Sequence, residues 1–122
     1  MRTARAELAL RMDRPESVLR VLDGFTDEAP VLAAWGELLS GRAEAARRRA
    51  LTEVKRAERT GEHLAEVEAR VALGASLTVL AGEAEGAGEL DRAESMAEIL
   101  PYPAGTRRAA WARDLLRDAG RG

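Results

Sequence analysis

The chain has 122 residues, a formal net charge of −2 at pH 7 and no cysteine. A chain of this length suits a single domain, spanning residues 1–122, with its own hydrophobic core. The lack of cysteine excludes disulfides, thiolate metal sites and cysteine nucleophiles.

Gly, Pro and Asp residues divide the chain into predicted helices, of which the first covers about 3–12. The second begins near Asp13 and Pro15, which suit a helix cap and a first turn, and it runs to about Phe25. Its apolar residues have the i, i+3, i+4, i+7 spacing of one helix face: Val18, Val21, Leu22 and Phe25.

The third and fourth predicted helices follow a break at residues 26–30. The third runs to about Leu39 and ends at Ser40 and Gly41. The fourth covers about 43–59 and ends at Gly61, where glycine is a common helix stop. Its apolar stripe consists of small residues that allow close helix packing: Ala43, Ala46, Ala50, Val54 and Ala57.

The fifth predicted helix, about 62–81, is apolar on two opposite sides. One side carries Leu64, Val67, Val71 and Ala75, and the other carries Leu73, Leu77 and Leu80. A helix that is apolar on two sides lies between neighbours and not on a surface, so we expect this helix at the centre of the fold.

Residues 82–88 contain three glycines and two glutamates, and they predict a flexible acidic loop. The sixth predicted helix covers about 89–100 and ends at Pro101 and Pro103. Its expected core residues are Leu90, Ala93, Ala97 and Leu100. A seventh helix is expected from about Thr106, with an apolar side formed by Trp111, Ala112, Leu115, Leu116 and Ala119.

Short connections between amphipathic helices are typical of antiparallel neighbours. Alanine and leucine dominate the composition and β-branched residues are scattered, which favours helices over strands. We therefore predict an all-α fold of stacked antiparallel helical hairpins, about three pairs followed by a C-terminal capping helix with a polar outer side.

Several short segments resemble the tetratricopeptide repeat (TPR), a helical hairpin of 34 residues. Trp35-Gly36 with Leu39, and Leu73-Gly74 with Leu77, resemble its Leu-Gly-x-x-Tyr step, and residues 88–93 resemble its Gly-x-x-x-x-Ala step. The first hairpin matches the pattern at Ala6, Ala9, Val18, Leu22, Phe25 and Pro30.

The resemblance is to degenerate, TPR-like hairpins such as those of bacterial transcriptional regulators, because Gly36 and Gly74 lie 38 positions apart. It implies a scaffold that binds a protein partner or self-associates without catalysis. The arginine and alanine richness, with Lys55 as the only lysine, is also typical of GC-rich bacterial coding.

No pattern in the sequence predicts a catalytic, cofactor or metal site. His63 is the only histidine, and with Glu62 and Glu66 it provides too few ligands for a zinc or di-iron centre. The glycines of 82–88 follow a helix, lie among glutamates and lack the Lys-Ser/Thr of a phosphate-binding loop. We therefore expect a protein without enzymatic activity, cofactor or metal.

The sequence also lacks membrane and export signals. Residues 1–12 have no continuous apolar stretch of the signal-peptide kind, and the longest weakly polar run, 71–82, is too short to span a bilayer. We expect a cytoplasmic protein that makes no membrane contact.

Charge is unevenly distributed along the chain. Residues 42–60 carry seven basic and three acidic groups, whereas residues 62–98 carry two basic and nine acidic groups. The fourth predicted helix has a basic face opposite its apolar stripe, formed by Arg48, Arg49, Lys55, Arg56 and Arg59. Three interpretations stay open for this face: an ordinary solvated surface, a docking site for an acidic protein or second copy, or a nucleic-acid contact.

These patterns predict a noncatalytic module for protein interaction or self-association, such as part of a larger bacterial regulator or assembly factor. One alternative is a nucleic-acid-binding domain that uses the basic face of residues 42–60. Another is a small-ligand sensor with a cavity among the third, fifth and seventh helices, near Trp35 and Trp111.

Overall fold

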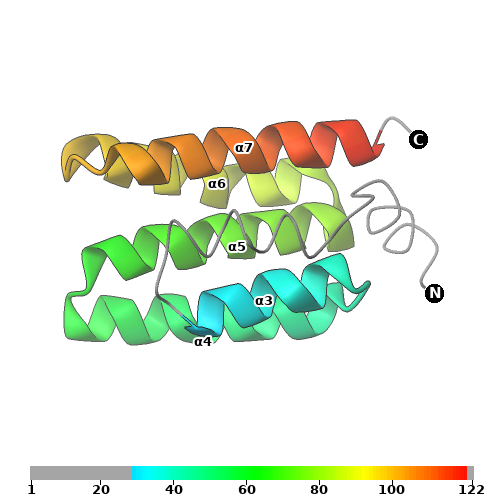
Figure 1. Cartoon of the computed structure of the whole chain (residues 1–122), viewed down its shortest axis with the longest axis horizontal. Helices are drawn as coiled ribbons and strands as arrows, with labels where there is room; N and C mark the ends of the chain where they lie inside the picture. The colour runs from blue at the N-terminus through cyan, green and yellow to red at the C-terminus, as the bar shows by residue number, and fades with distance from the viewer. Residues whose placement is uncertain (1–28, 121–122) are drawn as a thin grey trace.

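The computed structural model describes residues 29–120, which form five α-helices joined by short turns (Figure 1). The helices are α3 (Ala29–Leu39), α4 (Ala43–Thr60), α5 (His63–Ala81), α6 (Glu83–Ile99) and α7 (Pro103–Gly120). The first two predicted helices lie outside the described residues. The all-α class is confirmed for the described part of the chain, and so are the predicted limits of α4 and the end of α3.

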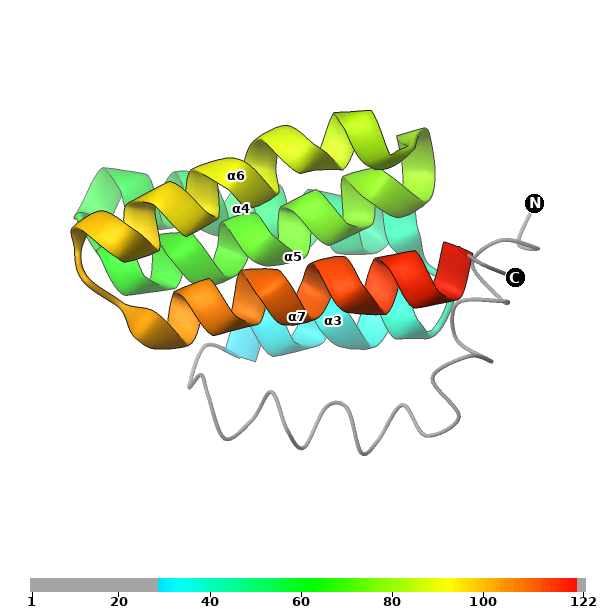
Figure 2. The ribbon, with the colours of Figure 1, turned by 90° about the horizontal axis from the view of Figure 1, so that it is seen from above.

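The five helices pack in sequence with α5 at the centre. α5 contacts α4 and α6 most extensively, and it also contacts α7 and α3. Figure 1 shows α3 and α4 on one side of α5 and α6 and α7 on the other. In Figure 2, α4 and α6 are displaced toward one edge and α3 and α7 toward the opposite edge. The predicted sandwiched position of this helix is therefore confirmed.

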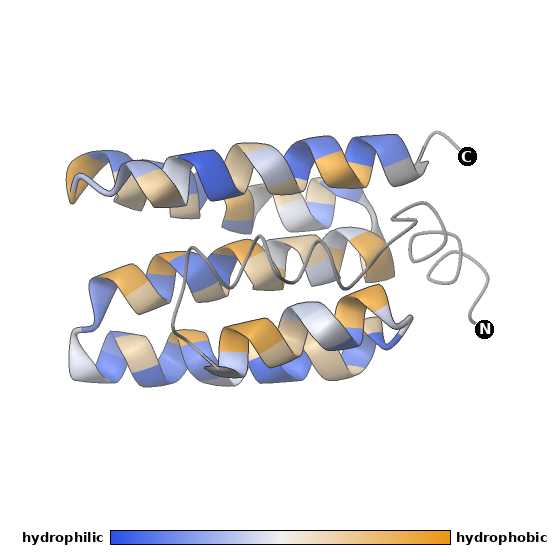
Figure 3. Ribbon diagram, in the orientation of Figure 1, coloured by the Kyte–Doolittle hydropathy of each residue, from blue (hydrophilic) through white to orange (hydrophobic). Residues whose placement is uncertain are grey.

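Apolar residues face the neighbouring helices, and they alternate with hydrophilic residues along α4 and α7 (Figure 3). The predicted stripe of small residues on α4 is confirmed, because Ala43, Ala46, Ala50, Val54 and Ala57 are all buried. Every residue of α5 from Ala65 to Ser76 is buried as well. Within residues 29–120, no helix combines the length and apolar character that crossing a membrane requires.

Glycines with positive φ lie in three of the four turns between the described helices, at Gly41, Gly61 and Gly82. Gly61 ends α4 with φ of 73°, and the amide of Glu62 donates to the carbonyl oxygen of Ala57 at 3.0 Å. This left-handed conformation with a back-bonded amide is the common glycine stop of an α-helix. Gly82 has φ of 110° and forms the whole turn between α5 and α6.

The predicted loop at 82–88 is wrong, because only Gly82 is non-helical and α6 begins at Glu83. Glu83 and Glu85 lie in the first turn of α6, where acidic side chains interact favourably with the helix dipole. The start of α7 is also earlier than predicted, at Pro103 instead of Thr106, since proline is well suited to a first helical turn.

Two leucines that were expected in the core are partly exposed. Leu64 is 51% exposed and Leu100 is 36% exposed. Both lie at the same end of the bundle, where α5 begins and α6 ends, so the adjacent helices cover them incompletely. The other three predicted core residues of α6 are buried: Leu90, Ala93 and Ala97.

Two glycines allow α5 and α6 to approach closely. A Cβ atom on Gly86 of α6 would lie 1.9 Å from the Thr78 hydroxyl oxygen and 2.3 Å from the carbonyl oxygen of Gly74 on α5. A Cβ on Gly74 would lie 2.8 Å from a side-chain carbon of Leu90. The backbone of Gly74 cannot move aside alone, so any larger residue at position 86 would push the two helices apart.

We expect Gly86→Ala to lower the free energy of unfolding by about 2 kcal/mol or more, within the range known for overpacked cores. Gly88→Ala is the matched control, because Gly88 is an exposed residue of the same helix and its added Cβ meets no described atom within 4 Å. This control should be neutral or stabilising by up to about 1 kcal/mol. Urea denaturation of both variants makes the comparison, and an equal effect of the two would contradict the close contact.

Candidate functional site

The predicted basic face lies on α4, and three of its five cations point away from the fold. Arg48, Lys55 and Arg59 are exposed on the side opposite the buried alanine stripe. Within residues 29–120, none of the three forms an ion pair or a side-chain hydrogen bond. Their charges are therefore exposed to solvent on this side of the helix.

Arg49, in contrast, joins α4 to α3. Its Nε and Nη2 atoms donate to the two carboxylate oxygens of Glu37 on α3, each at 2.9 Å. This bidentate geometry is the strongest form of an arginine–carboxylate contact. The hydrogen bond from Arg49 lowers the pKa of Glu37 below its ordinary value.

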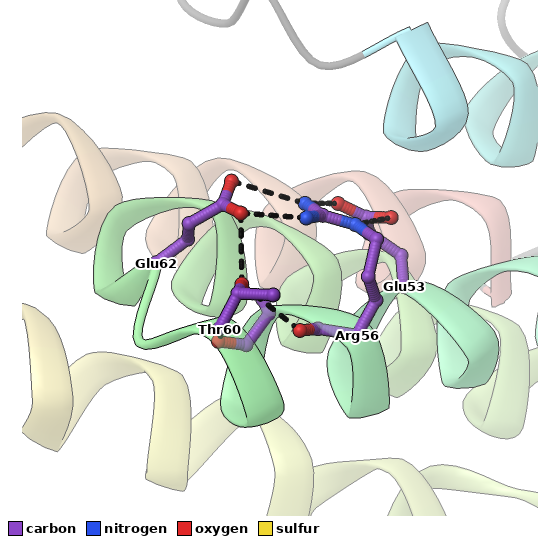
Figure 4. A network of polar contacts seen from close by, with 5 residues as sticks. Glu53, Arg56, Thr60 and Glu62 are labelled. Carbon is purple, nitrogen blue, oxygen red and sulfur yellow. Dashed lines mark hydrogen bonds and ion pairs between the residues drawn. The ribbon is translucent and has the colours of Figure 1, made fainter.

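Arg56 belongs to a polar network that crosses the turn between α4 and α5 (Figure 4). Its guanidinium donates to the buried Glu53 carboxylate and, at 2.6 Å, to Glu62. The hydroxyl of Thr60 also donates to Glu62, at 2.8 Å. Hydrogen bonds donated by Arg56 and then by Thr60 lower the pKa of Glu62, and the hydrogen bonds that Arg56 donates to Glu53 and Glu62 raise the pKa of Arg56.

The predicted basic face is therefore divided between two tasks. Arg49 and Arg56 hold carboxylates of the fold, whereas Arg48, Lys55 and Arg59 remain as an outward row, which we name the α4 cation row. A shallow open groove of about 480 Å³ runs beside this row between α3 and α4. Its lining residues are Pro30, Glu37, Ala45, Arg48, Arg49, Thr52 and Glu53.

A buried arginine, which sequence reasoning missed, ties three helices together. Arg70 of α5 is 5% exposed and donates to three carboxylates: Glu66 of its own helix at 2.9 Å, Glu58 of α4 at 2.7 Å and Glu89 of α6 at 2.9 Å. The i, i+4 spacing of Glu66 and Arg70 within a mainly apolar helix was the available signal. The partners on α4 and α6 gave no local signal.

A second buried ion pair joins α5 to α7. The carboxylate of Glu68 accepts hydrogen bonds from the Tyr102 hydroxyl at 2.7 Å and from Arg108 Nη1 at 3.1 Å. Glu68 is 2% exposed and Arg108 is 3% exposed. Burial raises the pKa of Glu68 and lowers the pKa of Arg108, because loss of water disfavours both charged forms.

The residues around His63 have other partners. His63 is exposed, while the carboxylate of Glu62 is bound to Arg56 and that of Glu66 is bound to Arg70. Among residues 29–120, no three or more histidine, aspartate or glutamate side chains are grouped so that they could hold a metal ion. The two glutamates nearest His63 in sequence, Glu62 and Glu66, therefore form ion pairs with arginines.

The two tryptophans pack on each other where a ligand cavity was expected. The indole rings of Trp35 on α3 and Trp111 on α7 have centroids 5.1 Å apart at an interplanar angle of 62°, and Trp35 is fully buried. Edge-to-face packing of this kind stabilises a core. At the two rings themselves, α3 and α7 are joined by aromatic packing.

Neither family models nor curated proteins nor solved structures gave a match to this chain. The arrangement of the described side chains is therefore the basis for any functional conclusion.

We expect Arg108→Met to lower the free energy of unfolding at pH 7 by about 3 kcal/mol or more, because it leaves the Glu68 charge buried and unpaired. Arg107→Met, which changes the exposed neighbour, should cost far less. The double variant Glu68→Gln/Arg108→Met should be more stable than Arg108→Met alone.

The deficit of Arg108→Met should shrink as the pH falls from 7 to 5. Burial raises the pKa of Glu68 and the charge of Arg108 opposes that rise, so removing Arg108 raises the Glu68 pKa further, and the variant gains more stability than wild type as this carboxyl is protonated. Denaturant titrations of wild type and variant at several pH values measure this difference. A deficit that is independent of pH would contradict the buried pair.

Proposed function

We propose that this chain is a noncatalytic protein-interaction module that docks an acidic partner on the α4 cation row. The observation that supports the proposal is the contrast within one helix face. Arg49 and Arg56 are held by carboxylates of the fold, whereas Arg48, Lys55 and Arg59 are exposed and lack such partners among the described residues.

The spacing and length of the α4 cation row also favour a partner segment that is helical or extended. Positions 48, 55 and 59 are separated by seven and four residues, which on a helix is one line of side chains about 16 Å long. The groove between α3 and α4 adjoins the row at Arg48, which belongs to its lining. An acidic helix or extended acidic segment would match both features.

The free energy expected from exposed ion pairs favours a salt-sensitive contact of moderate strength. An exposed ion pair contributes about 0.2–1 kcal/mol, so three pairs supply about 1–3 kcal/mol of binding free energy. That range corresponds to an affinity change of about fivefold to more than a hundredfold. Charges at the rim of an interface act chiefly on the association rate and on its dependence on salt.

We further propose that the helices form TPR-like hairpins, with α3/α4 and α5/α6 as pairs and α7 as the cap. The antiparallel order, the short turns and the displacement of α4 and α6 toward the same edge support this pairing (Figures 1 and 2). In such a stack α4 lies on the convex side, so the partner would bind outside the concave surface.

The triple variant Arg48→Gln, Lys55→Gln and Arg59→Gln should capture its partner from a lysate of the source organism with an efficiency reduced about fivefold or more relative to wild type at low salt. Unfolding should be unchanged, because these side chains are exposed. The control replaces three exposed arginines of α6 and α7 by glutamine: Arg92, Arg107 and Arg117. This control should capture as wild type does.

Protein and nucleic acid in the eluates distinguish the alternatives. One acidic protein that is recovered near stoichiometrically by wild type and control supports the proposal. Nucleic acid that is recovered only at low salt favours the nucleic-acid alternative. Equal capture by the triple variant would remove the cation row from the binding surface, and a salt-sensitive dimer in sedimentation experiments would identify the partner as a second copy.

A further inference from the structure

A separate cavity of about 260 Å³ lies between α6 and α7 over the last turns of α5. Figure 2 shows α6 and α7 diverging from their connecting turn. The residues of these two helices that line the cavity lie in the first half of α6 and the last turns of α7. The contact of Gly86 with Gly74 draws the start of α6 toward α5 and away from α7. The cavity is a consequence of this asymmetric packing.

The cavity has an apolar part formed by α6 and α7. Leu90 is buried beneath it, and Ala87 and Leu116 are half-buried along its walls. The hydroxyl of Thr78, also in the lining, donates to the carbonyl oxygen of Gly74 at 2.9 Å, so its hydrogen is already used within α5. A small aliphatic group would replace water here with a favourable change in free energy.

Charges of opposite sign face the cavity from its two walls. Glu83 lies on α6, and Arg113 and Arg117 lie on α7. Within the described part of the chain Glu83 forms no ion pair or side-chain hydrogen bond. No ion pair in this part therefore links Glu83 on α6 to the arginines on α7. Among residues 29–120, the one side-chain partner of Arg117 is the exposed Asp114 of its own helix, which accepts from Nη1 at 2.9 Å.

Carboxylates of α6 position Arg113, and only one nitrogen of its guanidinium takes part in the hydrogen bonds described. Its Nη2 atom donates to Asp91 at 2.6 Å and to Glu94 at 3.2 Å, while the bonds described in residues 29–120 leave Nε and Nη1 unused. These contacts fix one guanidinium at the cavity wall. An arginine held in this way loses little conformational entropy when it binds a carboxylate.

We propose that this cavity binds a small zwitterion with an aliphatic side chain, of the class of the apolar α-amino acids. The ligand's ammonium group pairs with Glu83, its carboxylate pairs with Arg117 and Arg113, and its side chain packs on Leu90 and Leu116. The site is distant from the α4 cation row, and the proposal does not depend on that surface. For a ligand of about ten non-hydrogen atoms we expect a dissociation constant on the order of 1 mM.

The first test is an NMR titration of the full chain with leucine and three relatives that each lack one feature. Leucinamide lacks the carboxylate, N-acetylleucine lacks the ammonium group, and glycine lacks the side chain. Leucine should shift the backbone amides of Ala87, Leu90 and Leu116 saturably, and each relative should bind about tenfold more weakly or worse. Absence of saturable shifts at about ten times the expected dissociation constant, or equal binding of N-acetylleucine, would overturn the proposal.

Two variants and two matched controls test whether Glu83 and Arg117 bind the charged groups of the ligand. Glu83→Gln and Arg117→Gln should each weaken leucine binding about tenfold or more, because each removes one charged partner. Glu85→Gln, in the same turn of α6, and Arg107→Gln, at the other end of α7, should leave it unchanged. All four side chains are exposed, so folding should be retained. Equal effects in variants and controls would show nonspecific charge effects and contradict the site.

Discussion

The rest of the structure depends on the burial of charged residues along α5. This helix is surrounded by four others and carries Glu66, Glu68 and Arg70 into the interior. A buried charge without a partner costs several kcal/mol, and three of the four neighbouring helices present a complementary group to these residues. α4 supplies Glu58, α6 supplies Glu89 and α7 supplies Arg108. These pairs join α5 to three neighbouring helices at defined positions along alanine-rich surfaces.

The same requirement determines which charges remain for other molecules. Arg49, Arg56 and Arg70 donate to carboxylates of the fold through two or more guanidinium nitrogens, whereas the bonds described for Arg113 and Arg117 each use a single nitrogen. On α4 this leaves the outward row of Arg48, Lys55 and Arg59, and at the α6–α7 cavity it leaves Glu83 on one wall and Arg113 and Arg117 on the other. The two proposed surfaces differ in chemistry because one is a line of like charges and the other pairs opposite charges with a cavity.

Sequence patterns within one helix correctly predicted the features that depend on interactions within that helix. The stripe of small residues on α4 and the stop at Gly61 are confirmed, because periodicity and a left-handed cap act within one helix. Gly86 misled the prediction, since a glycine that serves a close helix contact has the same appearance in sequence as one in a flexible loop. The pairing of Arg49 with Glu37, twelve residues away on another helix, was equally inaccessible. The α6–α7 cavity arises from helix divergence, which no single segment encodes.

The division of arginines between folding and binding is the central claim, and proton exchange at their Nε–H groups tests it most directly. Arg49, Arg56 and Arg70 each donate through Nε to a carboxylate, whereas Arg48 and Arg59 have no such partner within residues 29–120. Arginine side-chain NMR should therefore show slow Nε–H exchange for the first three, slowest for the buried Arg70, and exchange like that of a free guanidinium for the other two. Equally fast exchange in all five would show that the bridging contacts do not persist in solution, and it would contradict the account.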